Sequence, residues 1–249
     1  MKKTFKIVIF IIIAVLIIIA AYGVIKMNEL KSAEFNLPAN FTYTAHTGCE
    51  GTKENSLESI EKGYENGADI VEFDLNFDKS GNPVLCHDEP KGGEVTLDEA
   101  FRKVSEYANL KVNVDAKSDL HLEKVKPLAE KYGISDRIFF TGIKDEFVEN
   151  ARKTGVDYYL NIDVENPSKH SEEYLLSLVQ RVKEAGAIGI NFNKNNASSE
   201  LVEAFHENGL LVSIWTVDSK TELFEILLLS PDNITTRNPH KIRKIIEDK

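Results

Sequence analysis

The chain has 249 residues, with 30 basic and 40 acidic side chains and a formal net charge of −10. This charge argues against a nucleic-acid-binding protein or a basic patch for anionic lipids, because phosphate-rich partners attract clustered Lys and Arg. Two cysteines, Cys49 and Cys86, are too few for a disulfide framework. The sequence favours free thiols and leaves one disulfide between them as the alternative.

The N-terminal segment is apolar. Residues 7–25 contain no charged side chain, and nineteen residues are enough for a helix to span a bilayer. Three lysines precede this stretch, so the positive-inside rule places the N-terminus in the cytoplasm and the rest of the chain outside the cell. A cleaved signal peptide is the alternative, but its apolar core is usually shorter. We therefore expect a single-pass anchor with an extracellular C-terminal domain.

We expect three regions: the membrane anchor at 1–26, a polar linker at 27–40 and one large domain at 41–249. The anchor region contains four of the lysines and no acid. The part outside the membrane therefore carries 26 basic and 40 acidic residues, a net charge of −14. An acidic domain that handles phosphate usually requires a bound cation.

Apolar strand-like runs alternate with helical patterns from residue 41 onward. The expected strands are 41–46, 68–77, 110–116, 137–142, 157–163, 187–193, 210–217 and 232–236, with a hairpin arm at 82–87 inserted after the second. The expected helices are 56–66, 96–107, 120–131, 144–154, 171–185, 198–208, 219–229 and 238–248. Several of these helices end beside a glycine, as helices often do.

Eight strand–helix units predict an α/β fold, a (β/α)₈ TIM barrel preceded by one N-terminal transmembrane helix. A doubly wound open sheet is the alternative for any such alternation. The barrel is favoured because no glycine-rich nucleotide turn follows the first strand. In addition, polar residues gather at the C-terminal ends of several strands, where a barrel builds its active site.

Two of the expected strands carry acids on one face. Side chains alternate along a strand, so Glu72 and Asp74 share a face, and Asp115 shares one with Lys117. The intervening apolar residues suit packing against the outer helices. Burying three carboxylates together is costly without a cation, and oxygen ligands suit Mg²⁺ or Ca²⁺. The pattern predicts a divalent metal site at Glu72, Asp74 and Asp115; two solvated strand faces are the alternative.

Two histidines flank this cluster in the sequence. His46 and His87 each end a strand-like run, and imidazoles in that position can serve as general base and general acid. The residues do not show which histidine has which role. A zinc site is less favoured, because no usual zinc-ligand spacing is present.

The sequence then resembles a known family. Its motifs, in order, are AHTG (45–48), KENS (53–56), VEFD (71–74), CHDEP (86–90), NVDAK (113–117), SIWTVD (213–218) and ITTRNP (234–239). This ordered set resembles the glycerophosphodiester phosphodiesterases, which belong to the barrel superfamily of phosphatidylinositol-specific phospholipase C. The resemblance covers essentially the whole exported domain.

The resemblance implies roles for individual residues. His46 and His87 look like the catalytic acid–base pair. Glu72, Asp74 and Asp115 look like the metal ligands. The predicted substrate-binding residues are Glu54 of the Glu-Asn motif, Lys117 as a phosphate contact, and Trp215 as an aromatic lining the pocket.

The sequence departs from the family pattern at several positions. Thr47 stands where the family usually has a phosphate-binding Arg, and Asp115 stands where the third acid is usually Glu. Arg237 follows Thr236 where the late motif usually reads Thr-Asp; it either restores the missing positive charge or faces solvent. Only residues 89–95 replace a longer insertion that helps to cover the glycerol side of the site.

These observations predict a metal-dependent hydrolase of glycerophosphodiesters or related phosphodiesters outside the cell. Two alternatives stay open. One is a phospholipase-type enzyme on outer-leaflet lipids, favoured by the anchor and the short insertion. The other is a non-catalytic, degenerate barrel that binds phosphorylated wall or lipid head groups, favoured by Thr47. Retention of both histidines and all three acids argues against the binding-only alternative.

Overall fold

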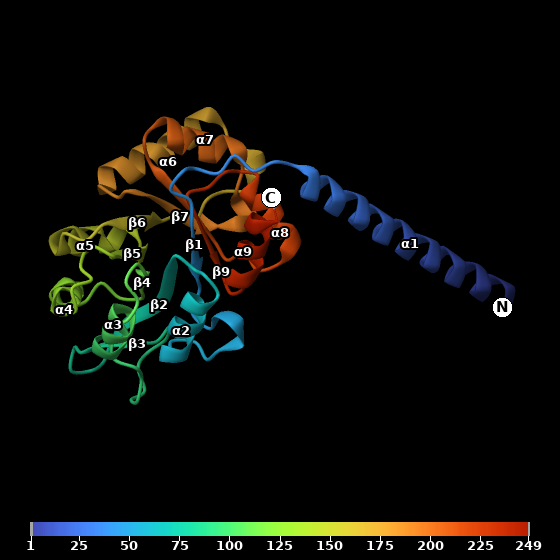
Figure 1. Ribbon diagram of the computed structural model, residues 1–249. Helices are drawn as coiled ribbons and strands as arrows, with labels where there is room; N and C mark the ends of the chain where they lie inside the picture. The colour runs from blue at the N-terminus through green and yellow to red at the C-terminus, as the bar shows by residue number, and fades with distance from the viewer. Residues whose placement is uncertain (1, 249) are drawn as a thin grey trace.

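The computed structural model describes residues 2–248. Nine strands form its sheet: β1 (Thr42–Ala45), β2 (Ile70–Phe77), β3 (Pro83–Leu85), β4 (Lys111–Ala116), β5 (Ile138–Ile143), β6 (Tyr158–Asn161), β7 (Gly189–Asn193), β8 (Leu211–Trp215) and β9 (Asn233–Thr236). The strand order is β1-β9-β8-β7-β6-β5-β4-β2-β3, and β1 also pairs with β2. This last pairing closes eight parallel strands into the predicted TIM barrel (Figure 1).

The helices surround the barrel. They are α2 (Leu57–Glu65), α3 (Leu97–Ser105), α4 (Val125–Lys131), α5 (Val148–Thr154), α6 (Glu172–Ala185), α7 (Ser199–Glu207), α8 (Lys220–Leu227) and α9 (Pro239–Glu247). Short 3₁₀ turns precede several of them, for example at Leu122–Lys124 and Asp145–Phe147. One large core of aliphatic and aromatic side chains, such as Phe73, Phe140 and Phe192, fills the space between strands and helices.

Strand β3 is the predicted hairpin arm. It pairs antiparallel with β2, with Leu75 opposite Leu85 and Phe77 opposite Pro83. The arm is not a barrel strand, because it pairs only with the end of β2, on the edge that faces β1 and beyond the β1–β2 pairing. It brings the segment that contains His87 back over the C-terminal end of β2.

The N-terminal helix α1 runs over Lys2–Ser32 and projects from the barrel (Figure 1). By length and composition its segment Ile11–Ser32 is apolar enough to cross a membrane. The helix continues through 27–32, which the sequence analysis assigned to a polar linker. The reason is tertiary packing: Met27 and Leu30, three residues apart on one helix face, contact the barrel core.

Two further contacts fix the end of α1 against α8. The ammonium of Lys26 pairs with the carboxylate of Glu225, and the ring of Phe35 lies 5.8 Å from that of Phe224. Leu37 and Phe41 also pack against the core before β1 begins. The segment between the apolar part of α1 and the first barrel strand is therefore docked on the barrel surface.

Candidate active site

Three carboxylates meet at the C-terminal ends of β2 and β4. One oxygen from each of Glu72, Asp74 and Asp115 lies within 4.8 Å of the other two. The strand register explains this, because β2 pairs with β4 with Asp74 opposite Asp115. Glu72 and Asp74 are only 5% and 3% exposed. The alternating pattern of both strands has therefore placed charged groups inside the barrel mouth, as the sequence predicted.

Burial favours the protonated form of Glu72. Desolvation, followed by the neighbouring charges of Asp74 and Asp115, raises the pKa of Glu72 to about 7, although His46 opposes the shift. The backbone N–H of Thr47 donates to Glu72 Oε2 at 2.7 Å and also favours the ionised form. An acid this perturbed, in a cleft with other acids, is typical of a functional site.

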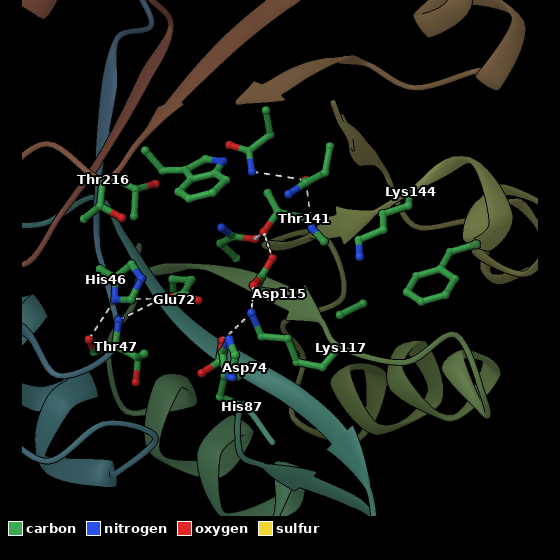
Figure 2. Close-up of a pocket in the computed structure, with 18 of the residues that line it drawn as sticks. His46, Thr47, Glu72, Asp74, His87, Asp115, Lys117, Thr141, Lys144 and Thr216 are labelled. Carbon is green, nitrogen blue, oxygen red and sulfur yellow. Dashed lines mark hydrogen bonds and ion pairs between the residues drawn. The ribbon is translucent and has the colours of Figure 1, made fainter. Parts of the chain in front are cut away.

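Lys117 supplies the one ammonium group in contact with the cluster among residues 2–248. Its Nζ lies 2.8 Å from Asp74 Oδ1 and also pairs with Asp115 (Figure 2). Burial disfavours the charged form, but the carboxylates of Asp115 and Asp74 outweigh it and raise the pKa of Lys117. Lys117 is therefore a permanent cation that partly neutralises the three acids.

Asn55 holds Asp74 in place, a role that the sequence analysis did not assign. Its amide Nδ2 donates to Asp74 Oδ2 at 2.7 Å, and its Oδ1 accepts from the Asp74 backbone N–H at 2.9 Å. Asn55 has a positive φ of 55°, a conformation that Asn tolerates better than most residues. The adjacent Glu-Asn pair was the available signal, but the predicted substrate residue was its first member, Glu54.

Asp115 is positioned from β5. The hydroxyl of Thr141 donates to Asp115 Oδ1 at 2.7 Å. Gly142 follows with φ 73°, and a Cβ there would lie 2.3 Å from the Ala116 carbonyl oxygen and 2.9 Å from Asp115 Oδ1. Any larger residue at position 142 would clash with the β4 backbone and with the Asp115 carboxylate, so this position requires glycine.

His46 lies directly after β1, beside the acids. Its Nδ1 is 2.8 Å from the carbonyl oxygen of Thr47 and 3.8 Å from Glu72 Oε2. A carbonyl only accepts, so Nδ1 carries the proton. In the neutral ring, Nε2 is then free to accept a proton from substrate or water.

His87 follows the hairpin arm β3 and is more exposed than His46, with 65% of its side chain accessible against 20%. Its Nδ1 is 2.9 Å from Asp88 Oδ1, and this contact lowers the pKa of Asp88. The carboxylate again requires the proton on Nδ1. Both histidines line the same cavity and present Nε2 without a hydrogen bond to any residue in 2–248.

The cavity around these groups measures about 980 Å³. All eight predicted site residues line it: His46, Glu54, Glu72, Asp74, His87, Asp115, Lys117 and Trp215. Polar residues that the sequence analysis did not select also line it, including Thr141, Asn161, Asn191 and Lys144. Glu54 lies at the rim, 59% exposed and 3.9 Å from the guanidinium of Arg237.

The two cysteines do not bridge. Both Cys49 and Cys86 are free thiols, the outcome that the sequence favoured. Cys49 is fully buried beneath the loop after β1, and desolvation raises the pKa of its thiol to about 11. Neither thiol is thus a candidate nucleophile.

Comparison with known proteins identifies the family of this chain. Residues 37–194 match the model of the glycerophosphoryl diester phosphodiesterase family. The chain belongs to this family. It is therefore an enzyme of the phosphoric diester hydrolase class.

Relatives and solved structures agree. A glycerophosphodiester phosphodiesterase of Bacillus altitudinis is 24% identical over 243 residues, covering 82% of this chain and 97% of that protein. A putative glycerophosphoryl diester phosphodiesterase of Silicibacter pomeroyi superimposes with a TM-score of 0.69 at 18% identity, covering 86% and 95% of the two chains. An Oleispira antarctica phosphodiesterase, solved with its product sn-glycerol-3-phosphate, superimposes with a TM-score of 0.66 at 18% identity, covering 85% of this chain and 97% of that chain. At this identity the structures support the fold.

The acidic cluster fits the divalent ion that the glycerophosphoryl diester phosphodiesterase fold implies. The donor set is three carboxylates from two rigid strands, and hard cations prefer such oxygen ligands. Two of the acids are buried, and Lys117 balances only one of their three charges. The remaining negative charge is what a divalent cation would neutralise.

Thr47 has a structural role in this member of the glycerophosphoryl diester phosphodiesterase family. Its side chain is buried, at 1% exposure, and its Oγ1 accepts from the Asn55 backbone N–H at 2.5 Å. Together with the contact to Glu72, this bond fixes the loop after β1. Thr47 lines the cavity, but Asn55 engages its hydroxyl, which also donates to Asn55 Oδ1 at 3.4 Å.

Proposed function

We propose that this protein is a metal-dependent hydrolase that cleaves glycerophosphodiesters or closely related phosphodiesters outside the cell, from a membrane-anchored position. Family membership supports the reaction class. The observation that carries the proposal is the meeting of Glu72, Asp74 and Asp115 with His46 and His87 in one cavity. A site with an acid–base pair and a cation-binding triad has the parts that phosphodiester cleavage needs.

The metal site would use Glu72, Asp74 and Asp115. A bound Ca²⁺ or Mg²⁺ would supply positive charge for a non-bridging phosphate oxygen. Lys117 would contribute a second positive charge from the floor of the site, because it is held there by two of the same acids.

The histidine geometry suggests the order of proton transfers. His46 is the more buried, and its proton on Nδ1 leaves Nε2 to accept the proton of the attacking hydroxyl. The nucleophile is water or a neighbouring hydroxyl of the substrate. His87 lies at the open rim, where a leaving alcohol would depart. In its doubly protonated form, with Nδ1 held by Asp88, it would donate its Nε2 proton to that alkoxide. The products are a phosphomonoester, or a cyclic phosphodiester, and an alcohol.

The substrate is proposed to be a small glycerophosphodiester, because two relatives that match this chain over nearly their whole length are called glycerophosphodiester phosphodiesterases. A lipid of the outer leaflet is the second candidate. The apolar helix α1 favours it, since a membrane anchor would keep the enzyme close to lipid.

One experiment separates these candidates. The protein purified in detergent would be assayed on glycerophosphocholine, glycerophosphoethanolamine, lysophosphatidylcholine micelles and bis(p-nitrophenyl) phosphate, with and without chelator. We expect metal-dependent release of glycerol 3-phosphate from the first two. Preferential cleavage of the lipid would favour the phospholipase alternative, and binding without turnover would favour a degenerate barrel.

A further inference from the structure

Arg237 lies next to His46 at the mouth of the barrel. It follows directly after β9, which pairs with β1 in a register that puts Thr236 opposite Ala45. The backbone N–H of His46 donates to the Thr236 carbonyl at 2.9 Å. Arg237 is therefore the lateral neighbour of His46 in the barrel wall, and it lines the same cavity.

Asp218, at the end of the SIWTVD motif, orients this arginine. One carboxylate oxygen accepts from the Arg237 backbone N–H at 2.7 Å, and the other lies 3.3 Å from Nη1. Within residues 2–248, Nε and Nη2 make no hydrogen bond, and Nη2 is only 3.9 Å from Glu54 Oε1. The guanidinium is thus held along one edge while its other donors stay available.

The other cations around the cavity are less suited to a phosphate beside His46. Lys117 follows β4, which is separated from β1 by β2, so its charge is not on the His46 side. Arg181 belongs to α6 and is bound through both Nε and Nη2 by Asp145. Lys144 follows β5, which is separated from β1 by β2 and β4 in the barrel. A monoanionic diester entering among three carboxylates needs a further positive charge on the His46 side.

We propose that Arg237 binds the phosphate of the substrate, through Nε and Nη2, on the side of the site next to His46. The inference rests on the proposed function and names the residue that supplies the charge Thr47 lacks. A guanidinium suits this task because its paired N–H groups match two phosphate oxygens. Glu54 would act as the counter-charge that keeps the side chain over the cavity when no anion is bound.

The test compares Arg237→Ala, Arg237→Gln and Arg237→Lys with the matched control Arg181→Ala, which removes another arginine of the cavity wall. For each variant, kcat, KM and the inhibition constant of sn-glycerol 3-phosphate would be measured, together with the Ca²⁺- or Mg²⁺-dependent melting temperature. Arg237→Gln retains much of the side-chain length, so it serves if the alanine variant fails to fold.

We expect Arg237→Ala and Arg237→Gln to lower kcat/KM about 100-fold and to weaken product inhibition about 10-fold, as the loss of a charged hydrogen-bonding partner would. Arg237→Lys should recover part of both, and Arg181→Ala should stay within about threefold of wild type, since Asp145 already neutralises it. The ion-dependent rise in melting temperature should persist in all four.

An unchanged inhibition constant for sn-glycerol 3-phosphate in Arg237→Gln would overturn the inference, even if activity fell. A residue with a purely structural role would lower activity without changing the affinity for the product. Equal losses in Arg181→Ala would also overturn it. If the wild-type protein cleaves no diester, the proposed function fails separately. Calorimetric binding of sn-glycerol 3-phosphate then decides: weaker binding to Arg237→Gln supports the anion site, and equal or absent binding in both proteins overturns it.

Discussion

The ammonium of Lys117 lies 2.8 Å from Asp74 Oδ1 while it also pairs with Asp115. One lysine thus bridges two of the three acids that we propose as metal ligands. Because both strands fix their carboxylates, the lysine compensates repulsion that would otherwise oppose folding of the barrel mouth. If a divalent ion binds the proposed ligands Asp74 and Asp115, it would replace the Lys117 ammonium as their counter-charge. The ammonium would then be available to the phosphate.

Replacing Lys117 with Met should therefore destabilise the ion-free protein more than the ion-loaded protein. Removing one partner of a largely buried ion pair leaves uncompensated charge, and we expect a loss of about 1–3 kcal/mol in chelator. At this chain length each kcal/mol corresponds to roughly 2–4 °C in melting temperature. Calorimetry with chelator and with millimolar Ca²⁺ or Mg²⁺ measures both values; equal losses in the two conditions would contradict this account.

Divalent ions should raise the melting temperature of the wild-type protein by mass action. At one hundred times the dissociation constant the gain is about 2.7 kcal/mol. Asp74→Asn should abolish the rise, whereas the surface variant Asp98→Asn should keep it, because Asp98 pairs with Lys131 and Tyr132 at the end of α4 and does not line the cavity. A flat melting temperature across a millimolar range of both ions would count heavily against the site.

Without a divalent ion, stability should fall as the pH rises from about 4.5 to 7. The folded-state pKa of Glu72 is raised to about 7 from 4.5, so in this window the folded protein retains a proton that the unfolded chain releases. Glu72→Gln should remove this component of the pH dependence. Urea unfolding in chelator at several pH values tests the sign, and a wild-type profile identical to that of Glu72→Gln would show that Glu72 is not the cause.

His46→Ala and His87→Ala should each lower the rate on a natural diester by about 10²–10⁴-fold. Neither should affect the ion-dependent melting temperature, since neither histidine is a proposed ligand. On a p-nitrophenyl phosphodiester, whose leaving group needs no acid, we expect His87→Ala to recover much of its rate and His46→Ala not to. The reverse pattern would exchange the two roles, and wild-type activity in both variants would refute the acid–base assignment.

The proposed location makes the barrel accessible from outside. Protease added to intact cells should release a fragment of roughly barrel size, because the lysines before the apolar stretch hold the N-terminus in the cytoplasm. Cells permeabilised with detergent provide the control for total protease sensitivity. A barrel that resists protease until the membrane is broken would place the domain on the other side.

The strands and the acidic cluster were predictable because they depend on local alternation. Every expected strand overlaps an observed one, and the faces assigned to Glu72, Asp74 and Asp115 agree with the register of β2 and β4. The role of Asn55 was not predictable in this way. It depends on a loop residue with positive φ whose side chain reaches Asp74, nineteen positions later.

Two other features also depended on tertiary structure. From the sequence alone, the side chain of Arg237 could lie either at the barrel mouth or in solvent. The pairing of β9 with β1 places it at the mouth, where it lines the cavity. Residues 27–32 looked like a linker because their composition is polar. They continue α1 to Ser32, and Met27 and Leu30 on one face of the helix pack against the core.

The docking of α1 on α8 has a consequence for where this enzyme can work. A flexible linker would let the barrel rotate freely and reach a range of distances from the membrane. In the proposed membrane-anchored state, the contacts of Lys26 with Glu225 and of Phe35 with Phe224 would instead restrict the height and orientation of the barrel above the bilayer. The anchored enzyme would then meet its substrates only within a thin layer next to the lipid surface, and it would reach new substrate by lateral diffusion in the membrane.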